Sequence, residues 1–173
     1  MKRARLNRQS WIDAGLIALV AEGPNALAAE PLARRLETTK GSFYWHFKDV
    51  PEFQKAVIRD WQSRAFADVV NALAEDGSAE QRLRRFGKRM LADRQDPALR
   101  TWARSDKSVA RAIAQVDAER LTYLGNVLKQ LGITNPEFAQ STLAALIGLP
   151  QIGGKTRPAR AFETLTDLVV ALQ

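Results

Sequence analysis

Apolar residues recur along most of the chain at spacings of three and four positions, the period of an amphipathic α-helix. In residues 10–21, for example, Ile12, Leu16 and Leu19 fall on one helical face. No segment shows the sustained apolar–polar alternation of a half-buried strand. The pattern predicts an all-α fold of about nine helices. Their expected ranges are 10–21, 30–36, 40–46, 51–74, 78–94, a short helix from 96, 108–131, 135–152 and 159–172.

Capping signals mark several of these boundaries. Asp49 precedes Glu52 by three positions, and Ser78 precedes Gln81 by the same spacing, which is typical of the first turn of a helix. Gly132 follows the long apolar stripe that ends near residue 131, and glycine is common just after the end of a helix. The first four expected helices are short or compact and basic at their surface, and the later ones are longer. This difference predicts two domains, residues 1–60 and residues 61–173, joined by the long fourth helix.

Composition excludes several kinds of site. Hydrophobic residues make up 46% and charged residues 26% of the 173 residues, which predicts a packed core. The chain has no cysteine and a single histidine, His46, so we expect no disulfide, no metal site and no cofactor. No apolar run approaches the ~20 residues of a membrane span. We therefore expect a soluble, cytoplasmic protein.

The net charge is +7 with a sequence pI near 10.1, which favours an anionic partner such as nucleic acid. The positive charge concentrates in two places. The N-terminal residues 1–8 contain four cations and no acid, and residues 82–94 contain six cations and one acid.

The segment "TTKGSFYWHF", residues 38–47, gathers aromatic and polar side chains directly after a short apolar helix at 30–36. Phe43 and Phe47 are four residues apart, so both can face inward from one short helix. The remaining side chains of that helix then face outward. A short helix presented by a partner helix suits the major groove of DNA, so the segment predicts a helix-turn-helix.

The stretch "LARRLETTKGSFYWHFKDVPEFQKAV" resembles the N-terminal helix-turn-helix of the TetR family of bacterial transcriptional regulators, and "GSFYWHFKD" is its most specific part. The resemblance extends over about residues 8–62. It implies an N-terminal three-helix DNA-binding domain, a C-terminal helical domain for dimerisation and effector binding, and a palindromic DNA operator. The positions matching the family's DNA contacts are Thr39, Lys40, Ser42, Tyr44, Trp45, His46 and Lys48.

Three positions depart from the family pattern. Glu37 stands where a turn glycine is usual, which costs about 1 kcal/mol if the position needs positive φ. Ala28 or Ala29 stands where a capping threonine or serine is usual, and Val50 replaces a usual lysine or arginine. Trp45 could serve the core, the DNA surface, or both.

The resemblance also implies a small-molecule effector and a homodimer. Bulky side chains on the middle helices are candidates for the effector pocket, although aromatic residues at helical spacing are more often core. They are Trp61, Phe86, Met90, Trp102 and Tyr123. Apolar positions on the last two helices predict a four-helix dimer interface. They are Leu143, Leu146, Ile147, Phe162, Leu165 and Val169.

These expectations together predict a sequence-specific transcriptional regulator, a repressor that its effector releases from the operator. The alternatives are an activator of the same fold and a helical protein that binds nucleic acid without sequence preference. An enzyme is not expected, because the sequence contains no phosphate-binding loop, nucleophile elbow or acid–base pair. For the basic run at 82–94, a solvated helical face is preferred over an arginine that points inward to meet an acidic effector.

Overall fold

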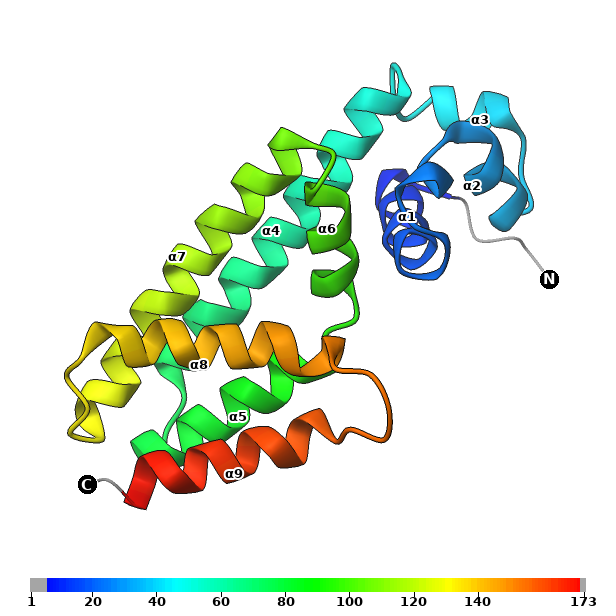
Figure 1. Cartoon of the computed structure of the whole chain (residues 1–173). Coiled ribbons are helices and arrows are strands. Elements are labelled where there is room, and N and C mark those ends of the chain that lie inside the picture. Colours follow the sequence, from blue (N-terminus) through cyan, green and yellow to red (C-terminus); the bar gives the residue numbers. More distant parts are fainter. Residues whose placement is uncertain (1–5, 172–173) are drawn as a thin grey trace. The chain divides into compact units, whose positions relative to one another are not determined.

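The structure is a computed structural model that describes residues 6–171, and the basic residues Lys2, Arg3 and Arg5 lie outside that range. Between residues 6 and 171 it contains nine α-helices and two 3-10 turns and no strand, so the predicted all-α class is confirmed (Figure 1). The helices are α1 (Arg8–Glu22), α2 (Ala29–Arg35), α3 (Lys40–Tyr44), α4 (Val50–Ala74), α5 (Ala79–Ala92), α6 (Gln95–Ala103), α7 (Lys107–Gln130), α8 (Pro136–Gly148) and α9 (Pro158–Ala171). The 3-10 turns are Pro24–Ala26 and Leu149–Gln151.

Side-chain caps explain where several helices begin. The Asp49 carboxylate accepts a hydrogen bond from the backbone N–H of Glu52 at 2.7 Å, which opens α4 as predicted. Ser78 and Gln81 form a reciprocal capping box at the start of α5. Gly132, at φ 78°, follows the end of α7. Each cap satisfies a backbone group that the first or last turn leaves without a helical partner.

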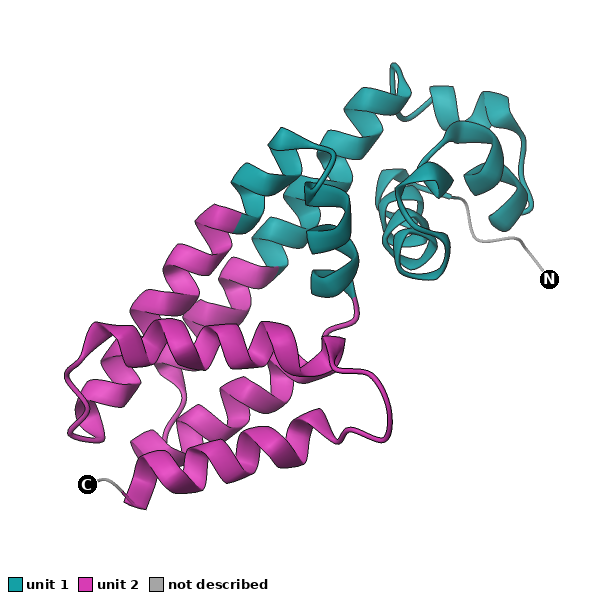
Figure 2. Cartoon of the chain, viewed as in Figure 1, with its two compact units in different colours: residues 1–64, 95–113 teal, residues 65–94, 114–173 magenta. Residues whose placement is uncertain are grey.

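The chain divides into two compact units, shown in Figure 2. Unit 1 contains residues 1–64 and 95–113, and unit 2 contains residues 65–94 and 114–173. Helices α4 and α7 each contribute residues to both units. The sequence predicts a DNA-binding domain before residue 60 and an effector-binding and dimerisation domain after it. That division of functions stays a prediction.

The core of unit 1 is built around aromatic rings. Trp11, Phe43, Phe47 and Phe53 are buried, and Phe43 lies 5.3–5.4 Å from the rings of the other three. The four rings make four contacts, and three of these meet edge to face: Phe43 with Trp11, Phe43 with Phe53, and Phe47 with Phe53. Edge-to-face packing of aromatic rings adds to the energy of their burial. The aromatic core holds the short α3 against α1 and α4, which a helix of five residues could not achieve by its own backbone hydrogen bonds.

Unit 2 is held together by aliphatic and aromatic side chains from α4, α5, α7, α8 and α9. They include Val69, Leu83, Phe86, Tyr123, Leu124, Val127, Leu143, Leu146, Phe162 and Val169, all buried. Helices α5 and α9 pack closely because α5 has Gly87 opposite Phe162. A Cβ atom at position 87 would lie 2.0 Å from the Phe162 ring, so the contact depends on glycine.

Candidate nucleic-acid interface and a pocket in unit 2

The turn between α2 and α3 follows from two backbone features. Glu37 has a φ of 50°, the left-handed conformation that the sequence comparison with a usual glycine anticipated. The Thr38 N–H then donates to the Ala33 carbonyl at 2.8 Å, and the chain turns away from α2. Ala28 precedes α2 without a side-chain cap, as its lack of a hydroxyl predicts.

Thr39 opens α3 as its N-cap. The Thr39 hydroxyl accepts a hydrogen bond from the Ser42 N–H at 3.3 Å. At the other end, the Phe47 N–H donates to the Phe43 carbonyl at 3.1 Å, so the backbone keeps a helical turn as far as Phe47. Phe43 and Phe47 face the core of unit 1, which turns the side chains between them outward.

The seven predicted DNA contacts therefore lie on one short segment with different exposures. Ser42 and His46 are half-buried, and the other five are exposed: Thr39, Lys40, Tyr44, Trp45 and Lys48. Trp45 is 88% exposed. That value excludes the core role that the sequence left open for Trp45, and it leaves a large apolar ring in contact with solvent.

The charges beside α3 differ in whether they are neutralised. Arg35 pairs with Glu22, and Arg34 lies 3.8 Å from Glu30. Across the described residues, by contrast, Lys40 and Lys48 have no carboxylate within salt-bridge distance. The outer face of the α3 segment thus combines free positive charge with exposed aromatic rings.

Comparisons with known proteins found similar sequences over part of the chain and similar folds over nearly all of it. No family model matches the chain. A 59-residue stretch is 37% identical to the HTH-type transcriptional regulator SrpR of Pseudomonas putida, covering 34% of this chain and 28% of that protein. The chain matches less than half the length of each of its two curated relatives.

Solved structures match nearly the whole chain. A Saccharomonospora viridis protein solved in complex with choline superposes with a TM-score of 0.78 at 13% identity, covering 94% of both chains. A transcriptional regulator of the TetR/AcrR family from Thermobifida fusca has a TM-score of 0.67 at 16% identity, covering 94% of this chain and 96% of the other. This chain has the TetR fold. The helix-turn-helix predicted from "GSFYWHFKD" is α2 and α3 of that fold.

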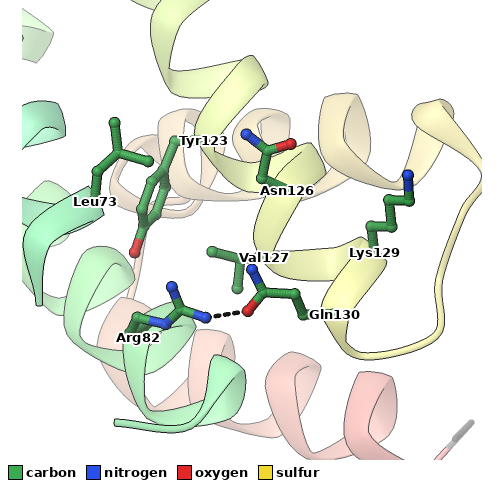
Figure 3. Close-up of a pocket in the computed structure, with 7 residues that line it drawn as sticks. All are labelled: Leu73, Arg82, Tyr123, Asn126, Val127, Lys129 and Gln130. Atoms are coloured by element: carbon green, nitrogen blue, oxygen red, sulfur yellow. Dashed lines mark hydrogen bonds between the residues drawn. The ribbon is translucent and has the colours of Figure 1, made fainter. Parts of the chain in front are cut away.

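Unit 2 of this TetR fold contains a pocket of about 540 Å³ (Figure 3). Residues of α4, α5 and α7 line it: Leu73, Arg82, Tyr123, Asn126, Val127, Lys129 and Gln130. Of these, only Tyr123 was among the predicted effector residues. The prediction rested on bulky side chains such as Trp102 and Met90, whereas most of the residues that line the pocket are polar.

The five predicted effector residues do not form one cluster. Trp61 and Trp102 are buried side chains of unit 1. Phe86, Met90 and Tyr123 belong to unit 2, where the Phe86 and Tyr123 rings lie 4.7 Å apart and Met90 packs against the same core. Their role in effector binding stays a prediction, and Tyr123 is the member that reaches a pocket.

The arginines of α5 are mostly neutralised rather than freely solvated. Arg85 and Arg89 both pair with Glu75, at 2.8 and 2.5 Å, and Arg84 pairs with Glu80 and Asp167. The hydrogen bond from Arg85, opposed by some burial, lowers the pKa of Glu75 below its ordinary value. The sequence favoured a solvated face for these arginines. In the structure they form ion pairs that connect α5 to neighbouring segments.

The predicted dimer residues mostly serve the core of their own chain. Leu143, Leu146, Phe162 and Val169 are buried in unit 2, while Ile147 and Leu165 are partly buried against it. The other sides of α8 and α9 expose Phe138 and Leu168, which are 38% and 60% exposed. A dimer interface on α8 and α9 stays a prediction, and these exposed sides would carry it.

No helix within 6–171 has the length and apolar character needed to cross a membrane. The same residues contain no group of three or more histidine, aspartate or glutamate side chains placed to hold a metal ion.

Proposed function

We propose that this protein is a sequence-specific DNA-binding regulator of transcription that uses the outer face of α3 to read its operator. The observation that carries the proposal is the exposure of Tyr44 and Trp45 beside the unpaired Lys40 and Lys48, while Phe43 and Phe47 anchor the same turn in the core. A side chain held on a rigid turn loses little conformational freedom when it binds, which favours recognition.

Each exposed side chain has a contact that it can make with DNA. Lysine can bond the N7 and O6 atoms of guanine or a phosphate, and the Tyr44 phenol can donate to a phosphate while its ring rests edge-on against Phe43 at 5.3 Å. Thr39 and Ser42 add hydroxyl groups at the start of the helix. The similarity of a 59-residue stretch to the regulator SrpR supports the same reading.

We further propose that the protein acts as a homodimer on a palindromic operator in the cytoplasm, and that it is a repressor released by a small molecule. One α3 offers few contacts, and two copies related by a twofold axis would double them across half-sites about 34 Å apart. The choline bound to the Saccharomonospora viridis structure supports a ligand site in proteins of this fold.

The alternative of a non-specific polycation gains less support from the charges. Three of the four arginines on α5, namely Arg84, Arg85 and Arg89, are engaged by carboxylates of the same chain. A surface whose cations are already paired attracts the DNA backbone less strongly, because counterion release depends on free positive charge.

Binding-site selection from random duplex DNA tests the proposal. The protein should select one palindromic sequence and prefer it over scrambled DNA by at least about 10³-fold at physiological salt. Lys40→Ala and Tyr44→Ala should each weaken that binding by about 1–3 kcal/mol, because each removes a contact without touching the core.

Lys155→Ala is the matched control, since Lys155 is an exposed lysine between α8 and α9. It should bind the selected site like the parent. Selection that yields no preferred sequence would support the non-specific reading instead. Parental affinity in both the K40A and Y44A variants would show that α3 is not the reading element.

A further inference from the structure

The pocket in unit 2 contains an arginine whose partner carries no charge. Arg82 donates a hydrogen bond to the amide oxygen of Gln130, whereas the other three arginines of α5 bond to carboxylates. The Nε atom of Arg82 is buried and has no hydrogen-bond partner in the described chain. Arg82 is half-buried, its hydrogen-bond acceptor is neutral, and its Nε–H has no acceptor within the described residues. Its guanidinium can therefore still bind an anion.

A second unused donor lies beside it. The side chain of Tyr123 is 1% exposed, and no group among residues 6–171 hydrogen-bonds to its hydroxyl. Figure 3 shows this hydroxyl directed toward the Arg82 side chain. Burial raises the pKa of Tyr123 above its ordinary value, so the hydroxyl keeps its proton and remains a donor. A buried hydroxyl without a partner is costly, which argues for a ligand that completes it.

We propose that this pocket binds an organic carboxylate, whose two oxygens are held by the Arg82 guanidinium and the Tyr123 hydroxyl. The carboxylate takes the place of the Gln130 amide as the acceptor for Arg82. Lys129 adds a second positive charge to the rim, although Figure 3 shows its side chain extending away from the Arg82–Gln130 pair.

The remaining lining sets the shape and charge of the ligand. Leu73 and Val127 offer apolar surface, so the carboxylate should carry a hydrocarbon or aromatic body that fits within about 540 Å³. No carboxylate lines the pocket, while Arg82 and Lys129 give it two positive charges. A quaternary ammonium such as the choline of the Saccharomonospora viridis structure would therefore be repelled. That such a carboxylate is the effector rests on the proposed function; its binding to the pocket does not.

Calorimetry with the DNA-free protein tests the binding site. Octanoate and benzoate are the probes, and octanamide and choline are their uncharged and cationic counterparts. Octanoate or benzoate should bind, while octanamide should bind at least roughly tenfold more weakly and choline should not bind, because a charge-assisted bond is worth about twice a neutral one. Binding of octanamide or choline as tight as that of the carboxylates would overturn the proposal.

Three variants locate the head group. Arg82→Met keeps the aliphatic stem and should weaken carboxylate binding roughly tenfold or more, which is the usual loss for a hydrogen bond to a charged group. Arg160→Met removes a charge from an exposed position on α9, away from the pocket lining, and should bind like the parent. Gln130→Ala should raise the affinity, because it removes the acceptor that competes for Arg82.

Tyr123→Phe separates ligand binding from a purely structural role. The hydroxyl has no partner in the described chain, so its removal should leave the thermal stability of the free protein unchanged or higher. Carboxylate binding should nevertheless fall several-fold. Parental binding by both the R82M and Y123F variants would overturn the assignment, even if the protein binds DNA. Conversely, carboxylate binding to a protein that selects no DNA sequence would leave the pocket standing and reject the regulator.

Discussion

Glu37 sits in the turn of the helix-turn-helix with a φ of 50°, a conformation that side chains other than glycine adopt at a cost. The sequence alone raised this possibility, because glycine is usual at the matching position. In the structure, glutamate itself adopts the left-handed conformation in the turn between α2 and α3. The chain therefore carries a strained residue within the element that we propose reads DNA.

The strain at Glu37 should appear as a difference in stability between two replacements of this residue. Glu37→Gly should be more stable to urea than Glu37→Ala by about 1 kcal/mol, because only glycine relieves the left-handed conformation. Comparing the two variants cancels the loss of the Glu37 side chain, which both share. Equal unfolding midpoints would mean that the turn relaxes to a negative φ in solution.

Residue identity was not enough to place Trp45. Its neighbours Phe43 and Phe47 are 0% and 1% exposed, yet Trp45 is 88% exposed on the same turn. Hydrophobicity favours burial of all three rings, and helical geometry allows only those on one side to reach the core. An exposed tryptophan that contributes nothing to the core is a stronger candidate for binding than a buried one.

At the scale of elements, α5 and α9 depend on a single missing side chain. Gly87 lies in the middle of α5, where glycine is unfavourable for a helix, and its Cα faces the Phe162 ring of α9. The intrinsic preference of the helix and the packing of the pair therefore oppose each other at this position, and packing prevails.

Gly87→Ala should lower the free energy of unfolding by about 1–3 kcal/mol, because the new methyl group would overlap Phe162 and force the two helices apart. Gly125 provides the matched control: it also lies within a helix, α7, but a Cβ atom there would meet nothing within 4 Å. Gly125→Ala should stabilise the protein by up to about 1 kcal/mol. Thermal unfolding followed by circular dichroism measures both. Stabilisation by both substitutions would contradict the close α5–α9 contact.

At the scale of the whole molecule, the proposed homodimer requires a surface that joins two copies. The residues predicted for that role from their hydrophobicity are largely occupied in the core of unit 2, so replacing Leu143 by glutamate would bury a charge and unfold the protomer. Leu168 is 60% exposed on α9, so a charge at that position tests the interface without this difficulty.

Leu168→Glu should shift the protein from dimer to monomer in sedimentation while its helical content stays unchanged, because a charge at a dry interface loses its hydration. Operator binding should weaken with dimerisation, since a monomer contacts one half-site. Val70→Glu is the control, because Val70 is similarly exposed, at 62%, but lies on α4. If V70E separates the copies and L168E does not, the interface lies on α4. A parent protein that is monomeric at micromolar concentration would reject the dimer altogether.

The sequence by itself determined the nine helices and the inward face of α3. Caps such as Ser78 with Gln81, and pairs such as Phe43 with Phe47, act between residues three or four positions apart, so they are visible in a linear pattern. The range predicted for the eighth helix, 135–152, was the least accurate. In the structure α8 ends at Gly148, and a 3-10 turn follows it at Leu149–Gln151.

Only the tertiary structure decided which side of each helix its own chain covers. Apolar residues of α8 and α9 look alike in sequence whether they face unit 2 or a second copy, and the arginines of α5 look alike whether a carboxylate or an amide meets them. Those outcomes depend on contacts between residues far apart in the chain, such as Arg84 with Asp167 and Arg82 with Gln130. The helical period of the sequence shows that a helix has an apolar face. Which residues cover that face depends on how the helices pack.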